Sequence, residues 1–451
     1  MAATAIDSRI FRDIFSTEAM RRVFSDENRI RHYLAIEVAL AHVQAKLGII
    51  PQEAAAEIEK QAHVEKFDIE KLKKRTETIG YPVLPVVEQL VALCANGLGE
   101  WAHWGATTQD VTDTAAVMQV REALALIEDD LKAICESLAT LARRYRDTPM
   151  AGRSNLQQAV PITFGFKMAV ILAAFERHRT RLAELRPRVL VGEFGGAAGT
   201  LASLGNRGLE VQAALFQELQ LGQPEIAWHT ARDGFAEAAC FLGLVTGTMG
   251  KVAMDVKLMM QTEVGEVFEP FEHGRGSSST MPQKRNPISC NYIFACTSVV
   301  RQHVAALLEA LVEDHERSTG PWEIEWIALP EIFLLASGAL SQGRKLVAGL
   351  HVDAERMRAN LEITNGLIVS EAVMMGLAPT LGRERAHDLV YVICRKVVET
   401  GRPLLDLLCE DPEISHHLDR AALEKLVDPA NYLGLAGEMV DRVLNRRHAD
   451  T

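Results

Sequence analysis

The chain has 451 residues, of which 48% are hydrophobic, and a formal net charge of -12, so it can bury a large core and disfavours nonspecific nucleic-acid binding. Any anionic ligand must therefore be held by local cations. Seven scattered cysteines without a Cys-x-x-Cys pair, and a start that lacks a signal-peptide core, argue against a disulfide framework and predict a cytoplasmic protein.

Helical periodicity dominates the chain after a first region of shorter helical patterns. From Leu124 to Tyr145 apolar residues recur at alternating three- and four-residue steps until "RDTP", which predicts a core helix over about 113–146. The longest apolar run, "FKMAVILAAF", is about half a membrane span, so no membrane is expected. Strand signals are limited to short pieces such as "RPRVLVGEF". Further long helices are predicted over about 162–185, 233–261, 287–315 and 323–350.

Five long helices indicate a helical bundle. After it comes a mixed-charge helical tail with several breakers, such as "EDPE" and "VDPANYLG". The pattern predicts an all-α protein of three helical domains: an N-terminal domain (1–110), a central long-helix bundle (111–350) and a C-terminal domain (351–451).

Two patterns that look like cofactor sites fail their context tests. The glycine-rich "GEFGGAAGT" is not surrounded by alternating strands and helices, so it indicates a tight turn or close packing rather than a dinucleotide site. His416 and His417 are adjacent and would point in different directions on a helix. We therefore predict no nucleotide loop, no metal and no cofactor.

The first polar segment, "HWGATTQDVTDT", precedes the first long helix. It contains His103, Thr107, Thr108 and Asp110. These residues are candidates for contact with a ligand, although helix capping explains the threonines and the aspartate as well.

The second polar segment, "GRSNLQQAVPITFG", precedes the second long helix and contains Arg153, Ser154, Asn155 and Gln157. Packing of a buried amide also explains Gln157. The helix between the two segments spans roughly 50 Å at a rise of about 1.5 Å per residue. The segments therefore serve different purposes, or neighbouring subunits bring them together, which predicts an oligomer with shared sites.

The third segment, "GRGSSSTMPQKRNP", occupies residues 274–287 and ends where the fourth long helix begins. A flexible surface loop with solvated Lys284 and Arg285 is its simplest explanation. The three segments together, however, offer hydroxyl and amide donors at helix starts and a lysine, which suits carboxylates.

This combination favours enolate chemistry. Removing a proton beside a carboxylate leaves a dianion, which needs preorganised donors and a cation. Lys284 and Asn286 are candidates to meet that charge. A serine in the glycine-flanked loop is a candidate base once backbone amides, brought by loop closure, stabilise its alkoxide.

Residues "SSSTMPQKRNP" resemble the hallmark motif of the fumarase/aspartase superfamily from Ser278 onward, with Ser277 standing where that family usually has glycine. The other two polar segments look like the family's remaining signature regions. "EVGEVFEP" and "HERSTGPWEIEW" extend the likeness over nearly the whole chain. Within the superfamily, "WHTARD", "HERSTG" and "PANYLG" are most similar to the 3-carboxy-cis,cis-muconate cycloisomerases.

The resemblance implies a homotetramer with a central twenty-helix core and no cofactor. It implies that Ser278 is the catalytic base and that Lys284 and Asn286 bind the substrate carboxylate. Further candidates for substrate contact, in the same motif and in the carboxylate pockets, are Ser279, Met281, Thr107, Thr108 and Gln157.

The second segment departs from the family pattern. Lyases that expel an amine usually carry Thr-His where this chain has Ser154 and Asn155, and the cycloisomerases have a histidine near Gln158. An amine leaving group needs a proton, whereas a carboxylate, with a pKa of about 4, does not. This departure disfavours adenylosuccinate-type and argininosuccinate-type lyases. His103 and His229 are either surrogate acids or structural residues.

The sequence thus predicts an enzyme that acts on the alpha carbon of a small di- or tricarboxylate, with cycloisomerase as the leading hypothesis. The alternatives are an epimerase or carbon–nitrogen lyase of N-substituted aspartates such as iminodisuccinate, and a crystallin-like relative without turnover. Arg317 and Arg153 hold a further carboxylate or pair with acidic residues of the core.

Overall fold

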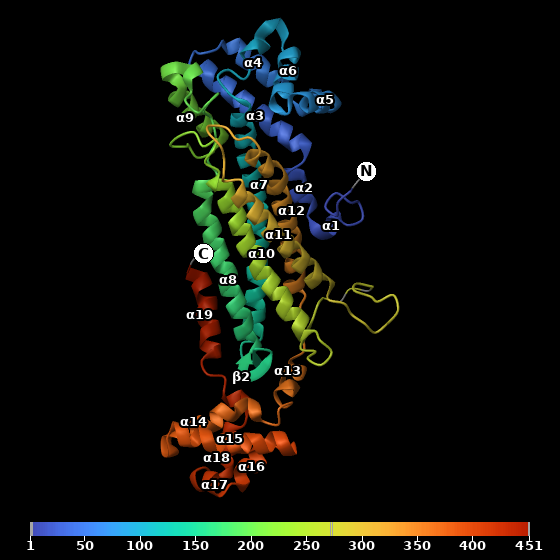
Figure 1. Cartoon of the computed structure of the whole chain (residues 1–451), viewed down its shortest axis with the longest axis vertical. Coiled ribbons are helices and arrows are strands. Elements are labelled where there is room, and N and C mark those ends of the chain that lie inside the picture. Colours follow the sequence, from blue (N-terminus) through green and yellow to red (C-terminus); the bar gives the residue numbers. More distant parts are fainter. Residues whose placement is uncertain (1–2, 271, 273, 450–451) are drawn as a thin grey trace. The chain divides into compact units, whose positions relative to one another are not determined.

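The computed structural model describes residues 3–270, 272 and 274–449, and its fold is all-α, as predicted (Figure 1). The chain forms two compact units, each assembled from distant stretches. The first unit comprises Met1–Leu131, His178–Met249 and Tyr292–Gln342, and the second comprises Lys132–Arg177, Gly250–Asn291 and Gly343–Thr451. The division into three domains stays a prediction.

The predicted long helices are all present. They are α7 (Thr108–Arg144), α8 (Phe164–Val189), α10 (Asp233–Met259), α11 (Ile288–Glu309) and α12 (Pro321–Ala348). Their ends differ from the predicted ones by up to six residues. The largest difference is at the end of α11, where the apolar Leu311 and Val312 are exposed and lie outside the helix.

Polar contacts connect the long helices within the first unit. The Thr297 hydroxyl on α11 donates to the Thr246 carbonyl on α10 at 3.0 Å, and Arg186 on α8 pairs with Glu128 on α7. By length and composition α10 and α12 are apolar enough to cross a membrane. More than half of each such apolar window is buried in protein, however, as expected of core helices in a bundle.

The shorter helices of the first unit begin at the N-terminal end of the chain. Apart from the first two, these helices pack together around a hydrophobic core that includes Tyr33, Leu40 and Leu90. These elements are α1 (Arg12–Phe15), α2 (Glu18–Val23), α3 (Asp26–Lys46), α4 (Gln52–Gln61), η1 (Val64–Lys66), α5 (Ile69–Ile79), α6 (Val83–Leu93), η2 (Ala95–Trp101), η3 (Ala202–Arg207) and α9 (Gly208–Leu219).

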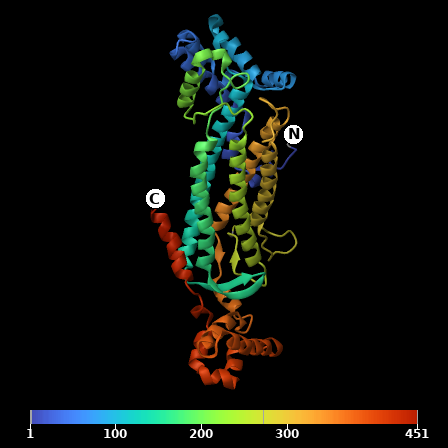
Figure 2. The same cartoon turned by 60° about the vertical axis from the view of Figure 1, so that its left-hand side comes forward.

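In the second unit, the second polar segment forms part of a β-hairpin, which was not predicted from the sequence. Strands β1 (Pro149–Ser154) and β2 (Gln157–Thr163) pair antiparallel and appear as two teal arrows in Figure 2. Asn155 and Leu156 form the turn with φ of 50° and 65°, the left-handed pair that a tight two-residue hairpin requires. The prediction missed the hairpin because its apolar alternation is short and contains a proline.

The strand signal in "RPRVLVGEF" was largely wrong. Helix α8 continues through Pro187 to Val189, and only Val191 makes an isolated bridge, to Gly222. The remaining pair of strands in the described part of the chain is β3 (Val267–Phe268) with β4 (His351–Val352).

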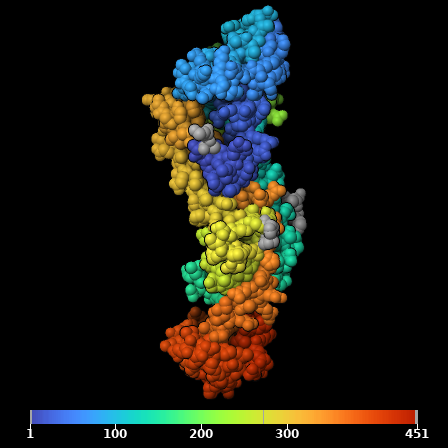
Figure 3. Space-filling view, turned by 90° about the vertical axis from the view of Figure 1, so that its right-hand side faces the viewer, coloured from blue at the N-terminus to red at the C-terminus, as the bar shows by residue number. Residues whose placement is uncertain are grey.

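The C-terminal helices of the second unit are α13 (Ala354–Leu361), η4 (Leu367–Val369), α14 (Ser370–Leu381), α15 (Arg383–Thr400), α16 (Leu404–Glu410), α17 (Pro412–His417), α18 (Arg420–Leu426), η5 (Pro429–Asn431) and α19 (Ala436–Ala449). Helices α14 to α18 pack around a separate core that includes Val390, Leu408 and Ile414. In the same unit, the yellow segment that includes residues 274–287 lies on the face shown in Figure 3.

Candidate active site

Asp110, in the first turn of α7, is the centre of a buried network in the first unit. Its Oδ2 accepts hydrogen bonds from the backbone N–H of Thr107 at 2.8 Å and of Gly196 at 3.0 Å. Its Oδ1 accepts from the N–H of Gly195 and from Nε2 of His229, both at 2.8 Å. Both oxygens are thus engaged inside the protein. We therefore interpret Asp110 as a residue that positions the first polar segment rather than one that contacts substrate.

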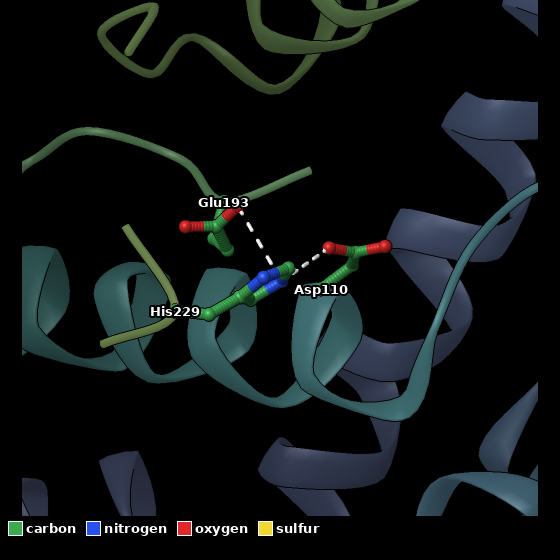
Figure 4. A group of neighbouring side chains, drawn as sticks. All are labelled: Asp110, Glu193 and His229. Carbon is green, nitrogen blue, oxygen red and sulfur yellow. Dashed lines mark hydrogen bonds and ion pairs between the residues drawn. The ribbon is translucent and has the colours of Figure 1, made fainter. Parts of the chain in front are cut away.

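His229 lies between two carboxylates, those of Asp110 and Glu193 (Figure 4). Its Nε2 is 3.5 Å from Oε1 of Glu193, whose Oε2 accepts the Trp228 N–H at 2.5 Å. Burial lowers the pKa of His229, but the hydrogen bond to Asp110 and the Glu193 carboxylate outweigh it and raise the pKa above its usual value. Burial raises the pKa of Glu193 to about 7.

Asp110, Glu193 and His229 are close enough to one another to hold a metal ion. Among the residues that the structure describes, they form the group of acidic, histidine or cysteine side chains with this property. The direct contact of 2.8 Å between Nε2 of His229 and Oδ1 of Asp110 is that of a hydrogen bond between the two side chains. The expectation that the protein binds no metal stays a prediction.

Arg317 contacts the same first polar segment. Its Nη1 donates to the Thr107 hydroxyl at 3.0 Å, and its Nη2 donates to the Ala197 carbonyl at 2.9 Å. The side chain is half-buried, and neither acceptor is a carboxylate. The guanidinium therefore keeps its charge available for an anion beside Thr107 and Thr108, where α7 begins.

His103 is held by a buried acid that the sequence did not reveal. Its Nδ1 lies 2.6 Å from Oε1 of Glu37, and its backbone N–H donates to Oε2 of Glu37 at 2.8 Å. Burial lowers the pKa of His103, but Glu37 outweighs this effect and raises it above its ordinary value. A histidine with a raised pKa keeps its proton to a higher pH than a free imidazole, which suits a general acid.

The second polar segment forms the tip of the β1–β2 hairpin. Ser154, Asn155 and Gln157 are exposed there. Arg153 forms two hydrogen bonds, of 2.8 and 2.6 Å, with the buried carboxylate of Glu266. Of the two roles considered for Arg153, the structure favours pairing with an acidic residue of the core.

The third segment is closed at its base by backbone and side-chain contacts. Asn286 donates to the Gly276 carbonyl through both its backbone N–H and its Nδ2, each at 3.0 Å, and Ser277 pairs with Arg285. Gly276 has a φ of 69°, and a Cβ there would lie 2.7 Å from the Asn286 carbonyl oxygen. Asn286 thus ties the loop together.

Within this loop, the Ser278 hydroxyl is oriented as an acceptor. Its Oγ accepts the backbone N–H of Thr280 at 3.3 Å and of Met281 at 3.1 Å. Ser279, Met281 and Lys284 are exposed on the same loop.

The start of α11 differs from what the sequence suggested. The buried carboxylate of Glu269 accepts the N–H of Ser289 at 3.1 Å and of Cys290 at 2.9 Å. These first-turn amides therefore bind the chain's own carboxylate and are not left for a substrate. At α8, likewise, the Thr163 hydroxyl caps the N–H of Phe166.

Four buried acids that hold candidate residues or the segments around them were not identified from the sequence: Glu37, Glu193, Glu266 and Glu269. Glu193 lies in the glycine-rich stretch that was set aside, and Glu266 and Glu269 lie in "EVGEVFEP". Their burial could have been inferred only from their position next to apolar or glycine-rich stretches, where a solvent-exposed charge is unusual.

The chain is similar to known proteins over nearly its whole length. A family model described as "Lyase" matches residues 12–301, and one described as "Adenylosuccinate lyase C-terminus" matches residues 366–443. Trans-aconitate decarboxylase 1 of Mycosarcoma maydis is 58% identical over 96% of this chain and 88% of that protein. The 3-carboxy-cis,cis-muconate cycloisomerase of Pseudomonas aeruginosa is 48% identical over 98% of this chain and 97% of that protein. The crystal structure of a fumarate lyase from Mesorhizobium sp. BNC1 superposes with a TM-score of 0.90 at 52% identity, covering 96% of this chain and 98% of that one.

Proposed function

Because the chain belongs to the fumarase/aspartase superfamily of lyases, we propose that it transfers a proton at a carbon next to a carboxylate of a small unsaturated tricarboxylate. The intermediate is an aci-carboxylate, in which the carboxylate carries the electron pair of that carbon. Such a species needs donors and cations placed before the reaction begins.

The observation that carries the proposal is the setting of the Ser278 hydroxyl. Two backbone N–H groups, of Thr280 and Met281, point at its Oγ. These donors stabilise an alkoxide more than a neutral hydroxyl, and so lower the cost of moving the proton between Ser278 and carbon. Lys284 supplies positive charge for a substrate carboxylate on the loop of Ser278, and Arg317 supplies it beside the first polar segment, with neighbouring subunits bringing the segments together in the assembly proposed below.

The substrate class rests on the relatives. Trans-aconitate and 3-carboxymuconate, the compounds in two of their names, are both alkenes that carry three carboxylates. In cycloisomerisation, a carboxylate oxygen of 3-carboxymuconate adds to the alkene. The displaced electron pair moves onto a carbon beside a carboxylate, the Ser278 hydroxyl protonates that carbon, and the serine alkoxide regains its proton from water.

Decarboxylation is the second candidate, and the 58% identity to a trans-aconitate decarboxylase favours it. The bond between the methylene carbon and its carboxylate breaks, CO2 leaves, and the double bond moves by one position. The electron pair reaches the carbon next to a remaining carboxylate, and the Ser278 hydroxyl protonates it. The product is methylidenesuccinate, and the serine alkoxide regains its proton from water.

Neither reaction expels an amine, so neither needs an acid to protonate an amine leaving group. This agrees with the presence of Asn155 at the hairpin tip, where amine-expelling lyases usually have histidine. Epimerisation of iminodisuccinate, in which a proton is removed and returned, shares the same apparatus and forms the third arm of the test. Elimination of an amine is disfavoured unless His103 supplies the proton.

The proposed assembly is a homotetramer with active sites shared between subunits. Helix α7 has 37 residues, which correspond to about 55 Å, between Thr107 and the start of the hairpin. This length supports a site in which neighbouring subunits supply the first and second segments. A cytoplasmic location and independence from cofactors belong to the same proposal.

The test incubates the purified protein in deuterium oxide with trans-aconitate, 3-carboxymuconate, the iminodisuccinate stereoisomers, and fumarate with ammonia, each in a separate reaction. Ultraviolet absorbance follows the change in the conjugated alkene, and NMR identifies the product and locates deuterium in it. We expect deuterium on the carbon beside a carboxylate with one of the two tricarboxylates. No conversion and no exchange with any of them would reject the proposal in favour of a crystallin-like relative.

A further inference from the structure

Arg317 owes its position to two acceptor groups that carry no charge. Its guanidinium donates to the Thr107 hydroxyl and to the Ala197 carbonyl, at 3.0 and 2.9 Å. Because neither acceptor is an acid, the hydrogen bonds orient the group without neutralising it. The direction in which the charge points is therefore set by whatever fixes Thr107 and Ala197.

One carboxylate fixes both segments. Asp110 accepts the N–H of Thr107 and the N–H groups of Gly195 and Gly196, which immediately precede Ala197. Asp110 is buried, so a shift of its side chain moves both acceptors of Arg317 together.

His229 is the side chain that holds Asp110. Its Nε2 donates to Oδ1 of Asp110, and its own backbone carbonyl accepts Nε2 of Gln109 at 2.8 Å. The imidazole is 3% exposed. The histidine is therefore fixed to the first turn of α7 both through its backbone and through its side chain.

We propose that His229 is a positioning residue which, through Asp110, sets the location of the Arg317 guanidinium for a substrate carboxylate. His229 itself touches no substrate in this arrangement. The inference deepens the proposed function and rests on it for the nature of the ligand.

The test is a double-mutant cycle between positions 229 and 317, measured by binding of propane-1,2,3-tricarboxylate, a saturated tricarboxylate that has no alkene to react. Calorimetry gives the dissociation constants of the wild type, H229N, R317Q and H229N/R317Q. Asparagine carries an amide too short to reach Asp110, so we expect H229N to weaken binding about tenfold. In the R317Q background the same change has less than a twofold effect, because the guanidinium it positions is gone.

The control variants separate positioning from general damage. Glutamine at 229 carries the same amide on a chain one methylene longer, so H229Q recovers most of the affinity lost in H229N. His32, an equally buried histidine that pairs with Glu122 in the same unit, has no contact with the Arg317 network, and H32Q binds the probe as the wild type does. Circular dichroism confirms that each variant is folded.

Turnover supplies a second readout. With whichever acid the enzyme converts, H229N raises KM about tenfold while the rate of deuterium exchange at saturation changes less than threefold. Wild-type affinity in H229N, or equal losses in the presence and absence of Arg317, would overturn the inference. If no acid is converted, but H229N weakens binding of the probe only when Arg317 is present, the proposed reaction is rejected and the proposed role of His229 is retained.

Discussion

Arg232 offers a direct test of the buried electrostatics beside the site. Its side chain is 0% exposed and donates to Asp113 through Nη1 at 2.6 Å and Nη2 at 3.0 Å. It also donates to Glu325 through Nε at 3.0 Å and through Nη2. One cation thus faces two buried carboxylates. Burial raises the pKa of Glu325 to about 7, although Arg232 lowers it in part.

Replacing Arg232 with methionine removes the cation and leaves both carboxylates in the core. Breaking a buried ion pair in this way costs about 3–5 kcal/mol of unfolding free energy. An unfolding entropy of about 2.1 cal/mol/K per residue gives about 0.9 kcal/mol/K for the whole chain, so R232M melts about 4 °C lower if the chain unfolds as one unit. Burial raises the pKa of folded Glu325, and loss of Arg232 removes the group that lowers it, so the deficit is larger at pH 8 than at pH 5.

Scanning calorimetry and urea denaturation of R232M, at pH 5 and at pH 8, measure both effects. The triple variant R232M/D113N/E325Q is the matched control, since it has the same cavity without unpaired charges, and we expect it to recover at least half of the loss. A deficit below about 1 kcal/mol, or a triple variant no more stable than R232M, would refute the reasoning.

Three further predictions concern the site and the assembly. S278A abolishes solvent exchange but keeps the assembly of the wild type; exchange at the wild-type rate, followed by NMR, would exclude Ser278 as the proton-transfer group. Because the pKa of folded Glu193 is raised to about 7 by burial, its stabilising contribution is present below about pH 4 and lost as pH rises through 7, by about 3 kcal/mol. E193Q, which stays neutral, removes this slope in urea denaturation, and an unchanged slope contradicts the burial argument. We expect specific activity to fall on serial dilution at the concentrations where sedimentation shows that the subunits dissociate. Full activity of monomers would contradict shared sites.

Apolar periodicity was sufficient to predict the long helices, because each buries one continuous face. It failed at their ends. The pattern carried the predicted α11 past Glu309 through Leu311 and Val312, two apolar residues that the structure leaves exposed. At α7 the start was predicted too late, at about 113 instead of Thr108. Asp110 accepts the N–H of Thr107, and the helix therefore begins before the first apolar residues of its buried face.

The surroundings of a candidate residue were predictable where its hydrogen-bond partners lie close to it in the sequence. The loop that carries Ser278 contains the amides of Thr280 and Met281 within three residues, so the motif itself describes the serine's environment. The pairing of Glu37 with His103, 66 residues away, was not predictable. Which acid reaches a given histidine depends on how helices pack, and many exposed acids are equivalent in a sequence.

The two-residue turn of the β1–β2 hairpin has an evolutionary consequence. Asn155 adopts a φ of 50°, a conformation that asparagine, aspartate and histidine tolerate better than other residues with a Cβ. Asparagine and histidine codons differ by one nucleotide. A single nucleotide change could thus place at position 155 the histidine that is typical of amine-expelling relatives. The turn already has a backbone conformation that histidine tolerates, so this change would not require a different loop.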